Sequence, residues 1–197
     1  MRNLLLCLAL AFGGCVWESG NDQDNTGDDI VGYPAGPYGT EFGQTVENFR
    51  IETVVCHNGV GEGRAFQLGD YLGTKAMLVT VHAGWCTYCK QQASTMETDT
   101  KETYESQGLD QVLVITQDPA GKFTRQLLLD YACTYMNQFG FTFPVGIDPN
   151  GEVLSRYFDG VPLNMLLDRR MVIRYKLTGM PPDRRLLAGN IEGLLNE

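Results

Sequence analysis

The chain has 197 residues, of which 43% are hydrophobic, and its formal net charge is −9. This length suits one domain of ordinary size with short appendages, and the apolar fraction supports a buried core, which excludes wholesale disorder. The negative charge argues against nucleic acid as a partner, because phosphate groups would repel the protein. Five acidic residues and no Lys or Arg lie between Val16 and Thr40, so the charge is concentrated near the N-terminus.

The N-terminus has the pattern of a secretory signal. Arg2 precedes a short apolar run that ends in small residues, and the run is shorter than the roughly 20 residues that a membrane-spanning helix needs. Phe12-Gly13-Gly14-Cys15 resembles the lipobox of bacterial lipoproteins, although Leu is more usual than Phe at its first position. The resemblance implies that residues 1–15 are a lipoprotein signal peptide and that Cys15 carries lipid. An ordinary signal peptide cleaved nearby is the alternative.

Residues 16–40 are acidic and rich in Gly, Asn and Pro, which predicts a tether that lifts a domain off a membrane. A disordered terminus without function is the alternative. The folded domain is expected over residues 41–197. Export would place it in a compartment where disulfides persist. Cys7 would be removed with the signal, and the remaining cysteines are Cys15, Cys56, Cys86, Cys89 and Cys133.

The first half of the domain contains two predicted strands. Residues 48–56 are typical of a strand that leads into a Gly-rich turn over residues 57–63. Residues 66–73 are predicted to be a short helical or turn segment. Residues 76–81 are almost continuously apolar and bounded by turn residues, which indicates a strand buried on both faces of a sheet.

Two cysteines separated by two residues follow this strand. Cys86 and Cys89 can close a disulfide within one helical turn, and the strand-to-helix context favours a redox dithiol. A helical face follows at a spacing of three or four residues, comprising Cys89, Ala93, Met96, Thr100 and Tyr104. We expect Cys86 at the helix start as the exposed attacking thiol, and Cys89 on the buried face as the resolving thiol.

The second half alternates strands and helices. A strand is predicted at residues 112–116, a helix at 122–138, a further segment at 143–147 with a turn at 148–151, and a hairpin from 163–167 and 171–175. Asp183 is predicted to cap a last helix, whose inner face carries Leu187, Ile191, Leu194 and Leu195. The pattern predicts an α/β fold with a mixed central β-sheet and helices on both faces.

Three segments resemble the thioredoxin-like superfamily, and in particular its membrane-tethered TlpA/ResA branch. Residues 83–90 resemble the superfamily's active site, residues 143–153 resemble a segment of that branch, and residues 160–168 resemble its cis-proline loop and following strand. The resemblance covers roughly residues 41–197. It implies a thioredoxin-like fold and thiol-disulfide oxidoreductase activity. Pro162 would then be a cis-proline beside the dithiol, with an ordinary trans-proline as the alternative.

By the same resemblance, Cys86 is the nucleophile and Cys89 the resolving cysteine. A Cys86 thiolate would attack a substrate disulfide, and Cys89 would then displace the mixed disulfide. No bound cofactor is expected, because the two sulfur atoms carry the electrons. The expected partners are protein thiols or disulfides, an unknown redox-recycling partner and, through the lipid anchor, a membrane. The protein is expected outside the cytoplasm, in the periplasm or cell envelope.

Several residues depart from the family pattern. Thr87 and Tyr88 replace a pair ending in proline, which leaves open whether the protein reduces, oxidises or isomerises. Thr80 and Gln92 stand where relatives carry acidic residues, and neither can act as a carboxylate base for Cys89.

Two further residues beside the dithiol are candidates for an auxiliary role. His82 could alter the thiolate population through its charge, or it could simply be packed at the strand end. Trp85, which directly precedes Cys86, is a further auxiliary candidate together with Thr87 and Tyr88.

Other functions remain open from the sequence. Cys56 and Cys133 could form a structural disulfide or stay as buried thiols. A metal-binding or metal-delivery module could use Cys86 and Cys89 with His82, or Cys56 with His57, although no second CxxC or paired His completes a four-ligand site. The Pro-x-x-x-Thr-x-x-Cys arrangement of peroxiredoxins is absent. The intact dithiol argues against a degenerate binding scaffold.

Overall fold

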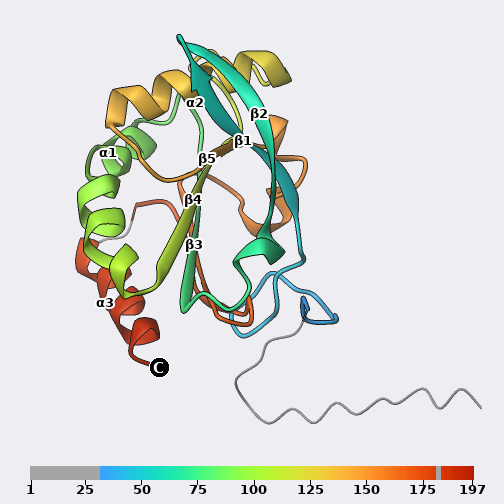
Figure 1. The fold of residues 1–197 in the computed structure, drawn as a ribbon, viewed down its shortest axis with the longest axis vertical. Coiled ribbons are helices and arrows are strands. Elements are labelled where there is room, and N and C mark those ends of the chain that lie inside the picture. Colours follow the sequence, from blue (N-terminus) through green and yellow to red (C-terminus); the bar gives the residue numbers. More distant parts are fainter. Residues whose placement is uncertain (1–31, 181–182) are drawn as a thin grey trace, which may run out of the picture.

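A seven-stranded mixed β-sheet forms the centre of the computed structural model, which describes residues 32–180 and 183–197 (Figure 1). The strands are β1 (Arg50–His57), β2 (Val60–Gln67), β3 (Ala76–His82), β4 (Leu109–Ile115), β5 (Val145–Ile147), β6 (Leu163–Asp168) and β7 (Ile173–Thr178). The α-helices are α1 (Thr87–Met96), α2 (Arg125–Phe139) and α3 (Arg184–Leu195). Shorter helical segments are η1 (Leu68–Tyr71), the π-helical η2 (Glu97–Glu102), η3 (Glu105–Gln107), η4 (Pro149–Gly151) and η5 (Ser155–Tyr157).

The predicted signal peptide of residues 1–15 lies outside the described residues, and so does most of the predicted tether. Cys15, the predicted lipid-bearing cysteine, also lies outside the described residues. None of the helices in the described part of the chain combines the length and the apolar character that crossing a bilayer requires.

The strand order is β2-β1-β5-β4-β3-β6-β7, and β3 pairs in parallel with β4 and antiparallel with β6. All residues of β3 are buried, as its continuous apolar run predicts for a strand covered on both faces. The mixture of parallel and antiparallel pairs confirms the predicted α/β fold class. The β6–β7 hairpin predicted from the sequence is also present.

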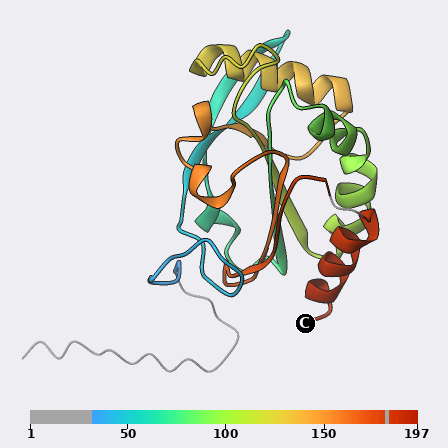
Figure 2. The ribbon, with the colours of Figure 1, turned by 180° about the vertical axis from the view of Figure 1, so that it is seen from behind.

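All three α-helices cover the same face of the sheet. In β3, Ala76 and Leu78 pack in the cluster that includes α3, whereas Val79 packs in the cluster on the opposite face. The cluster around α1 and α2 lies on the α3 side, because it includes Leu113 of β4, the register partner of Thr80. The opposite views of Figures 1 and 2 both place α1 and α3 on one side of the central strands.

The other face is covered mainly by irregular chain. Val46 of the N-terminal segment and Tyr157 of the segment 149–158 are buried in its core cluster. Within residues 32–180 and 183–197, helical structure on this face is limited to 3₁₀ turns, in place of the helices expected on both faces. Part of the reason lies at Asn150 (φ 56°) and Gly151 (φ 72°), whose left-handed backbone cannot continue a right-handed helix.

Strand β2 was not expected from the sequence, which predicts a Gly-rich turn at residues 57–63. The reversal is confined to Asn58 and Gly59, which both have positive φ, as two-residue hairpin turns require. Gly61 lies within β2, where an added Cβ would collide with the backbone carbonyl of Leu129 in α2. The glycine therefore serves close packing of helix on strand, which the sequence pattern does not distinguish from a loop.

The helical face predicted after the dithiol is confirmed. Cys89, Ala93, Met96, Thr100 and Tyr104 are all at most 5% exposed, although the chain passes from α1 into the π-helical η2 along this stretch. The predicted cap of the last helix is also confirmed, because the Asp183 side chain accepts a hydrogen bond from the backbone N–H of Arg185 at 2.9 Å.

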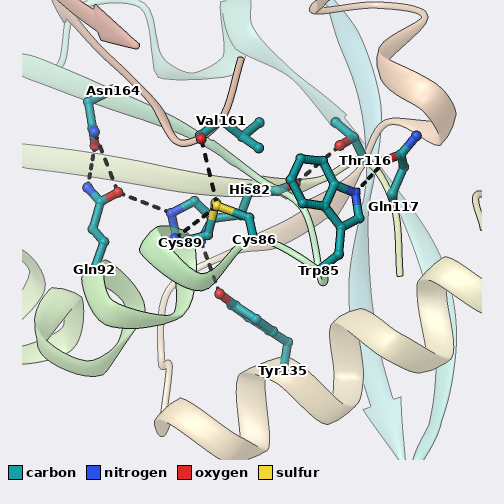
Figure 3. The surroundings of a disulfide bond; sticks show 10 residues. All are labelled: His82, Trp85, Cys86, Cys89, Gln92, Thr116, Gln117, Tyr135, Val161 and Asn164. Carbon is teal, nitrogen blue, oxygen red and sulfur yellow. Dashed lines mark hydrogen bonds between the residues drawn. A yellow bond between two sulfur atoms is a disulfide. The ribbon is translucent and has the colours of Figure 1, made fainter. Parts of the chain in front are cut away.

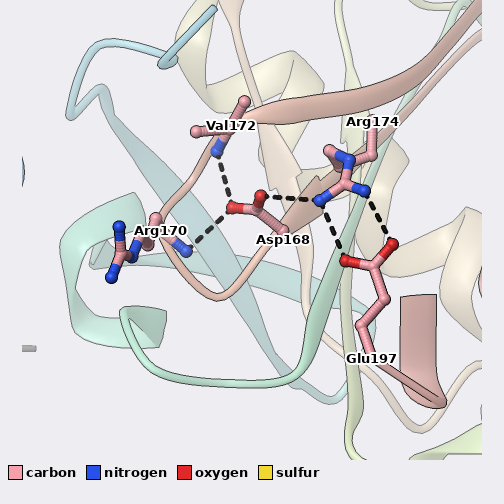
Figure 4. Close-up of polar contacts among 5 residues, drawn as sticks. All are labelled: Asp168, Arg170, Val172, Arg174 and Glu197. Carbon is pink, nitrogen blue, oxygen red and sulfur yellow. Dashed lines mark hydrogen bonds and ion pairs between the residues drawn. The ribbon is translucent and has the colours of Figure 1, made fainter. Parts of the chain in front are cut away.

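The C-terminus is attached to the β6–β7 hairpin by charged groups (Figure 4). The Asp168 carboxylate accepts hydrogen bonds from the backbone N–H groups of Arg170 and Val172 and so closes the turn. Arg174 donates to Asp168 at 3.2 Å and makes two hydrogen bonds to Glu197, the last residue. These contacts fix the end of α3 against the sheet.

Contacts of the domain begin before residue 41. The Tyr33 hydroxyl donates to the backbone carbonyl of Val46 at 2.7 Å, and the Tyr33 ring packs against the core cluster on the irregular face. Tyr38 forms a β-bridge with Thr45. The Pro-containing end of the predicted tether therefore lies against the folded domain.

Cys56 of β1 and Cys133 of α2 are joined in a disulfide, with their Cα atoms 5.5 Å apart. The sequence left open whether these cysteines form a disulfide or stay as buried thiols, and the structure shows the disulfide. It links the hairpin β1–β2 to the helix that packs across it, and it closes a loop with a sequence separation of 77 residues.

Replacing both Cys56 and Cys133 with Ala should lower the free energy of unfolding by about 4 kcal/mol, because a cross-link across a loop of this length restricts the unfolded chain. Urea unfolding without reductant measures the loss. As a matched control, Cys86→Ala with Cys89→Ala removes a bridge with a separation of 3 residues and should cost about half as much. An equal or larger loss in the control would contradict the chain-entropy account.

Candidate active site

The dithiol lies where β3 gives way to α1. Cys86 and Cys89 are joined in a disulfide with their Cα atoms 5.3 Å apart (Figure 3). Cys86 is the N-cap residue of α1, and its Sγ accepts a hydrogen bond from the backbone N–H of Cys89 at 3.1 Å. A negative charge on this sulfur would therefore face the positive end of the helix dipole.

The expectation of an exposed Cys86 is wrong for this disulfide form. Cys86 is only 4% exposed, and Cys89 is 0% exposed. Cys86 is covered because it packs with Ala83 and with Val161, which comes from a distant loop. The two sulfur-bearing residues still differ in the expected direction, but the exposed groups at this site are the neighbouring side chains of Trp85 and Tyr88, at 52% and 60%.

The loop before β6 reaches the dithiol. Because β6 runs antiparallel to β3, with Leu163 opposite Val81, the preceding residues fall beside the end of β3. The Val161–Pro162 peptide bond is cis, as the resemblance implied. The carbonyl oxygen of Val161 lies 3.7 Å from Cys86 Sγ, so a backbone acceptor and the reactive sulfur are presented together.

A network of buried and half-buried polar side chains lies beside the dithiol. His82 Nδ1 lies 3.2 Å from the Tyr135 hydroxyl, and His82 Nε2 lies 3.2 Å from Gln92 Oε1. Gln92 Nε2 donates to Asn164 Oδ1 at 2.5 Å, and the Thr80 hydroxyl lies 3.5 Å from the same oxygen. These residues come from β3, α1, α2 and β6, so the hydrogen-bonded network joins four elements around the active site (Figure 3).

His82 is neutral at physiological pH. Burial lowers its pKa from 6.5 to about 4, because the imidazolium would lose its hydration, and the hydrogen bond to Gln92 opposes this only in part. Since an amide oxygen can only accept, the Nε2–H donates to Gln92 and Nδ1 accepts from Tyr135. Of the two roles considered for His82, this geometry favours a packed, neutral side chain over a charged one that alters the thiolate population of the dithiol.

The network beside the dithiol is made of neutral groups. In the described part of the chain, no Asp or Glu side chain hydrogen-bonds to His82, Gln92 or Asn164. Sequence reasoning missed Asn164 and Tyr135 as members of the site. Asn164 could have been noticed as the polar residue in the otherwise apolar run of residues 163–167, whereas Tyr135 is indistinguishable from a core aromatic.

The remaining auxiliary candidates face outwards. The Trp85 Nε1–H donates to Gln117 Oε1 at 2.6 Å, and the Gln117 amide in turn donates to Asn150 Oδ1 at 3.4 Å. This fixes the indole beside Cys86 while leaving half of it exposed. Thr87 and Tyr88 are exposed in the first turn of α1.

Gly84 allows the chain to turn between the strand and the dithiol. An added Cβ at this position would lie 2.6 Å from the backbone of Asp118 and Pro119. The Gly84 N–H donates to the carbonyl of Gln117 at 2.7 Å, so the loop after β4 lies directly against this turn. The small residue before Trp85 is therefore required by close approach of two backbones.

The metal-binding alternative finds no support in the geometry. Residues 32–180 and 183–197 contain no group of three or more His, Cys, Asp or Glu side chains placed to hold an ion. Both ring nitrogens of His82 are engaged by Tyr135 and Gln92, and Cys56 is bonded to Cys133.

Comparison with known proteins identifies relatives with this arrangement. Residues 42–176 match the model of the AhpC/TSA family, which is more than half of the chain. The thiol-disulfide oxidoreductase ResA of Geobacillus thermodenitrificans is 28% identical over 119 residues, which make up 60% of this chain and 62% of that protein. The chain thus spans about three fifths of the length of this curated relative.

Solved structures share the fold. A Chlorobium tepidum protein assigned as a thiol:disulfide interchange protein DsbE has a TM-score of 0.63 at 22% identity, over 80% of this chain and 99% of that one. A secreted thiol-disulfide isomerase from Corynebacterium glutamicum has a TM-score of 0.59 at 14% identity, over 78% and 86%. At these identities the likeness concerns the fold, which is thioredoxin-like as predicted.

The buried His82 predicts a pH dependence of stability. Between pH 6.5 and about 4 the unfolded chain binds a proton at this histidine and the folded chain does not, so the free energy of unfolding falls as the pH is lowered. The loss across this window should be roughly 3 kcal/mol. His82→Phe should remove this part of the dependence of the unfolding free energy on pH, which urea unfolding at several pH values measures.

The other histidine of the chain, His57, supplies the control. It lies at the exposed end of the β1–β2 hairpin, and His57→Phe should leave in place the loss of stability that His82 causes. A slope lost with His57→Phe and retained with His82→Phe would contradict the assignment.

Proposed function

The chain belongs to the AhpC/TSA family, and from that premise we propose that it is an extracytoplasmic thiol-disulfide oxidoreductase whose Cys86–Cys89 pair exchanges with protein thiols and disulfides. One observation carries this proposal. The sulfur of Cys86 lies at a helix N-terminus and 3.7 Å from the backbone carbonyl of Val161, before a cis-proline. The site thus combines a stabilised thiolate with a backbone group that an extended polypeptide can bind.

The exchange proceeds in two balanced steps. In the reduced protein, the Cys86 thiolate attacks one sulfur of a substrate disulfide, and the other substrate sulfur leaves as a thiolate and takes up a proton. The Cys89 thiol then loses its proton and attacks Cys86 Sγ, which closes the Cys86–Cys89 disulfide and releases the second substrate sulfur. Two electrons pass from the protein to the substrate. The reverse sequence oxidises a substrate dithiol.

The groups around the sulfur atoms have distinct roles in these steps. The backbone N–H of Cys89 donates to Cys86 Sγ and stabilises a negative charge on this sulfur. The charge is present on the attacking thiolate, and it develops again in the reverse sequence, when Cys86 leaves the mixed disulfide as a thiolate. Cys89 is fully buried and Cys86 keeps 4% exposure in the disulfide form, so Cys86 is the cysteine nearer to the surface and the one that a substrate sulfur would reach. The exposed rings of Trp85 and Tyr88 offer apolar surface to the residues that flank the substrate cysteine.

The relatives support a protein dithiol or disulfide as the substrate and leave the direction of transfer open. One is named a thiol-disulfide oxidoreductase and another a thiol-disulfide isomerase. Peroxidase activity is not proposed, because the chain lacks the Pro-x-x-x-Thr-x-x-Cys arrangement. The reduction potential of the pair decides the direction: about −270 mV corresponds to a reductant and about −120 mV to a strong oxidant.

The proposal includes a location at the cell envelope. Residues 1–15 would be a lipoprotein signal peptide, Cys15 the lipid-bearing residue, residues 16–40 the tether and residues 41–197 the thioredoxin-like domain. Support comes from the lipobox-like sequence before Cys15. A disulfide remote from the active site, Cys56–Cys133, also suits an oxidising compartment.

Replacing either active-site cysteine tests the mechanism. Cys86→Ser should abolish exchange with a disulfide-bonded model peptide, because the attacking sulfur is lost. Cys89→Ser should instead accumulate a mixed disulfide between Cys86 and the peptide, detected by mass spectrometry without reductant. The Cys56→Ala, Cys133→Ala variant is the control and should keep its exchange rate. Exchange that survives in Cys86→Ser would contradict the proposed function.

Cys15→Ala should prevent lipid attachment in a bacterial host and move the protein from the membrane fraction to the soluble fraction. Incorporation of labelled fatty acid and cell fractionation are the measurements. Cys7→Ala is a matched control, since it changes a cysteine of the same segment outside the lipobox-like sequence and should leave labelling intact. Equal labelling of both variants would contradict Cys15 as the attachment site.

A further inference from the structure

We propose that His82, Gln92 and Asn164 form a hydrogen-bonded clamp that sets the position of the cis-proline loop relative to Cys86, and that the clamp thereby controls how well an extended polypeptide substrate engages the dithiol. These three residues are positioning residues, since they act through Cys86 and Val161. The inference rests on the proposed function, because it assumes that polypeptides are the substrates.

Each clamp residue belongs to a different element of the active site (Figure 3). His82 is the last residue of β3, four positions before Cys86. Gln92 lies in α1, one helical turn after Cys89. Asn164 lies in β6, two residues after Pro162. The clamp therefore connects the strand, the helix and the loop that together hold the reactive sulfur and its neighbouring carbonyl.

Gln92 is the central member, because both ends of its amide are used. Its Oε1 accepts from His82 Nε2 at 3.2 Å, and its Nε2 donates to Asn164 Oδ1 at 2.5 Å. Asn164 Nδ2 also approaches Gln92 Oε1 at 3.5 Å, so the two amides face each other. With two amides paired in this way, α1 and β6 cannot slide past each other without breaking these hydrogen bonds.

The ends of the clamp are held in turn. The Tyr135 hydroxyl of α2 donates to His82 Nδ1, which fixes both the tautomer and the plane of the ring. The Thr80 hydroxyl of β3 lies 3.5 Å from Asn164 Oδ1, and these residues are direct register partners. The orientation of Gln92 is therefore determined from both sides.

This position matters for a polypeptide and much less for a small disulfide. An extended substrate must place its sulfur against Cys86 and its backbone against Val161 at the same time, and these two groups lie 3.7 Å apart. A displacement of the loop relative to α1 would spoil the simultaneous contact. A small aromatic disulfide needs only the sulfur of Cys86, so it should be insensitive to the same displacement.

The clamp is uncharged over the pH range of thiol exchange. The titratable groups that neighbour His82 are Tyr135 of α2, with Tyr131 beside it, and the two cysteines of the dithiol. Burial raises the pKa values of Tyr131 and Tyr135, which keeps both phenols neutral. The clamp can therefore fix the geometry without adding a charge next to the thiolate.

The test compares two substrates across matched variants. His82→Phe fills the site but removes both ring hydrogen bonds, Gln92→Leu removes the central amide, and His82→Gln keeps a donor toward Gln92. His57→Phe is the surface control. Each variant is assayed for kcat/KM with a disulfide-bonded peptide and with a small aromatic disulfide, and folding is checked by circular dichroism.

For His82→Phe and Gln92→Leu we expect roughly a tenfold loss of kcat/KM with the peptide, as for the loss of one or two buried hydrogen bonds, and a change of less than about twofold with the small disulfide. His82→Gln should recover most of the loss, and His57→Phe should match the unmodified protein. Because Gln92 is only half-buried, Gln92→Leu keeps the test available if His82→Phe does not fold.

Equal losses with both substrates would overturn the clamp, because they would indicate a general effect on the thiols or on folding. Unchanged peptide kinetics in His82→Phe or Gln92→Leu would overturn it as well, and so would a failure of His82→Gln to recover activity. If the unmodified protein reacts with neither substrate, the proposed oxidoreductase function itself fails, which is a different outcome.

Discussion

Strand β3 has to pair its backbone on both edges and bury its side chains on both faces, and the active site follows from this constraint. Its parallel partner β4 brings the loop at Gln117 to the turn at Gly84, and its antiparallel partner β6 brings Val161 and Pro162 to the same end of the sheet. The chain must then leave the sheet at His82, and α1 begins at the dithiol. Three parts of the chain that are distant in sequence meet there because one strand is paired on both sides: residues 82–89, the loop at Gln117 and the loop at Val161 and Pro162.

The parts of this arrangement that depend on local pattern could be predicted from the sequence. The two-residue spacing of Cys86 and Cys89, the buried stripe of the following helix and the cap at Asp183 are all set within a few residues. The position of Pro162 followed from a family resemblance rather than from local pattern. Periodicity and capping residues carry this information because helices and strands expose one face to the core.

What the sequence could not supply are the consequences of register and of distant packing. Cys86 is buried because Val161, 75 residues later, packs over it. Asn164 belongs to the site because it is paired with Thr80 across β3 and β6. Strand β2 contains glycines that a pattern assigns to a turn, whereas in the fold Gly61 makes room for α2. Each of these features needs a partner whose identity is fixed only when the sheet order is known.

The buried polar groups beside the dithiol have a physical logic of their own. A carboxylate at Gln92 or Thr80 would have to be desolvated next to a sulfur that itself becomes negative, and two such charges oppose each other strongly in a dry site. Neutral amides and a neutral imidazole can hydrogen-bond to one another without adding charge, as His82, Gln92 and Asn164 do. A network in which each member is hydrogen-bonded has one favourable arrangement, and breaking it leaves buried polar groups unpaired at a high cost in free energy. Such a network therefore specifies geometry more than it adds stability. In the proposed clamp the geometry that it specifies is the spacing between Cys86 Sγ and the carbonyl oxygen of Val161, the two groups that the proposed polypeptide substrate would contact.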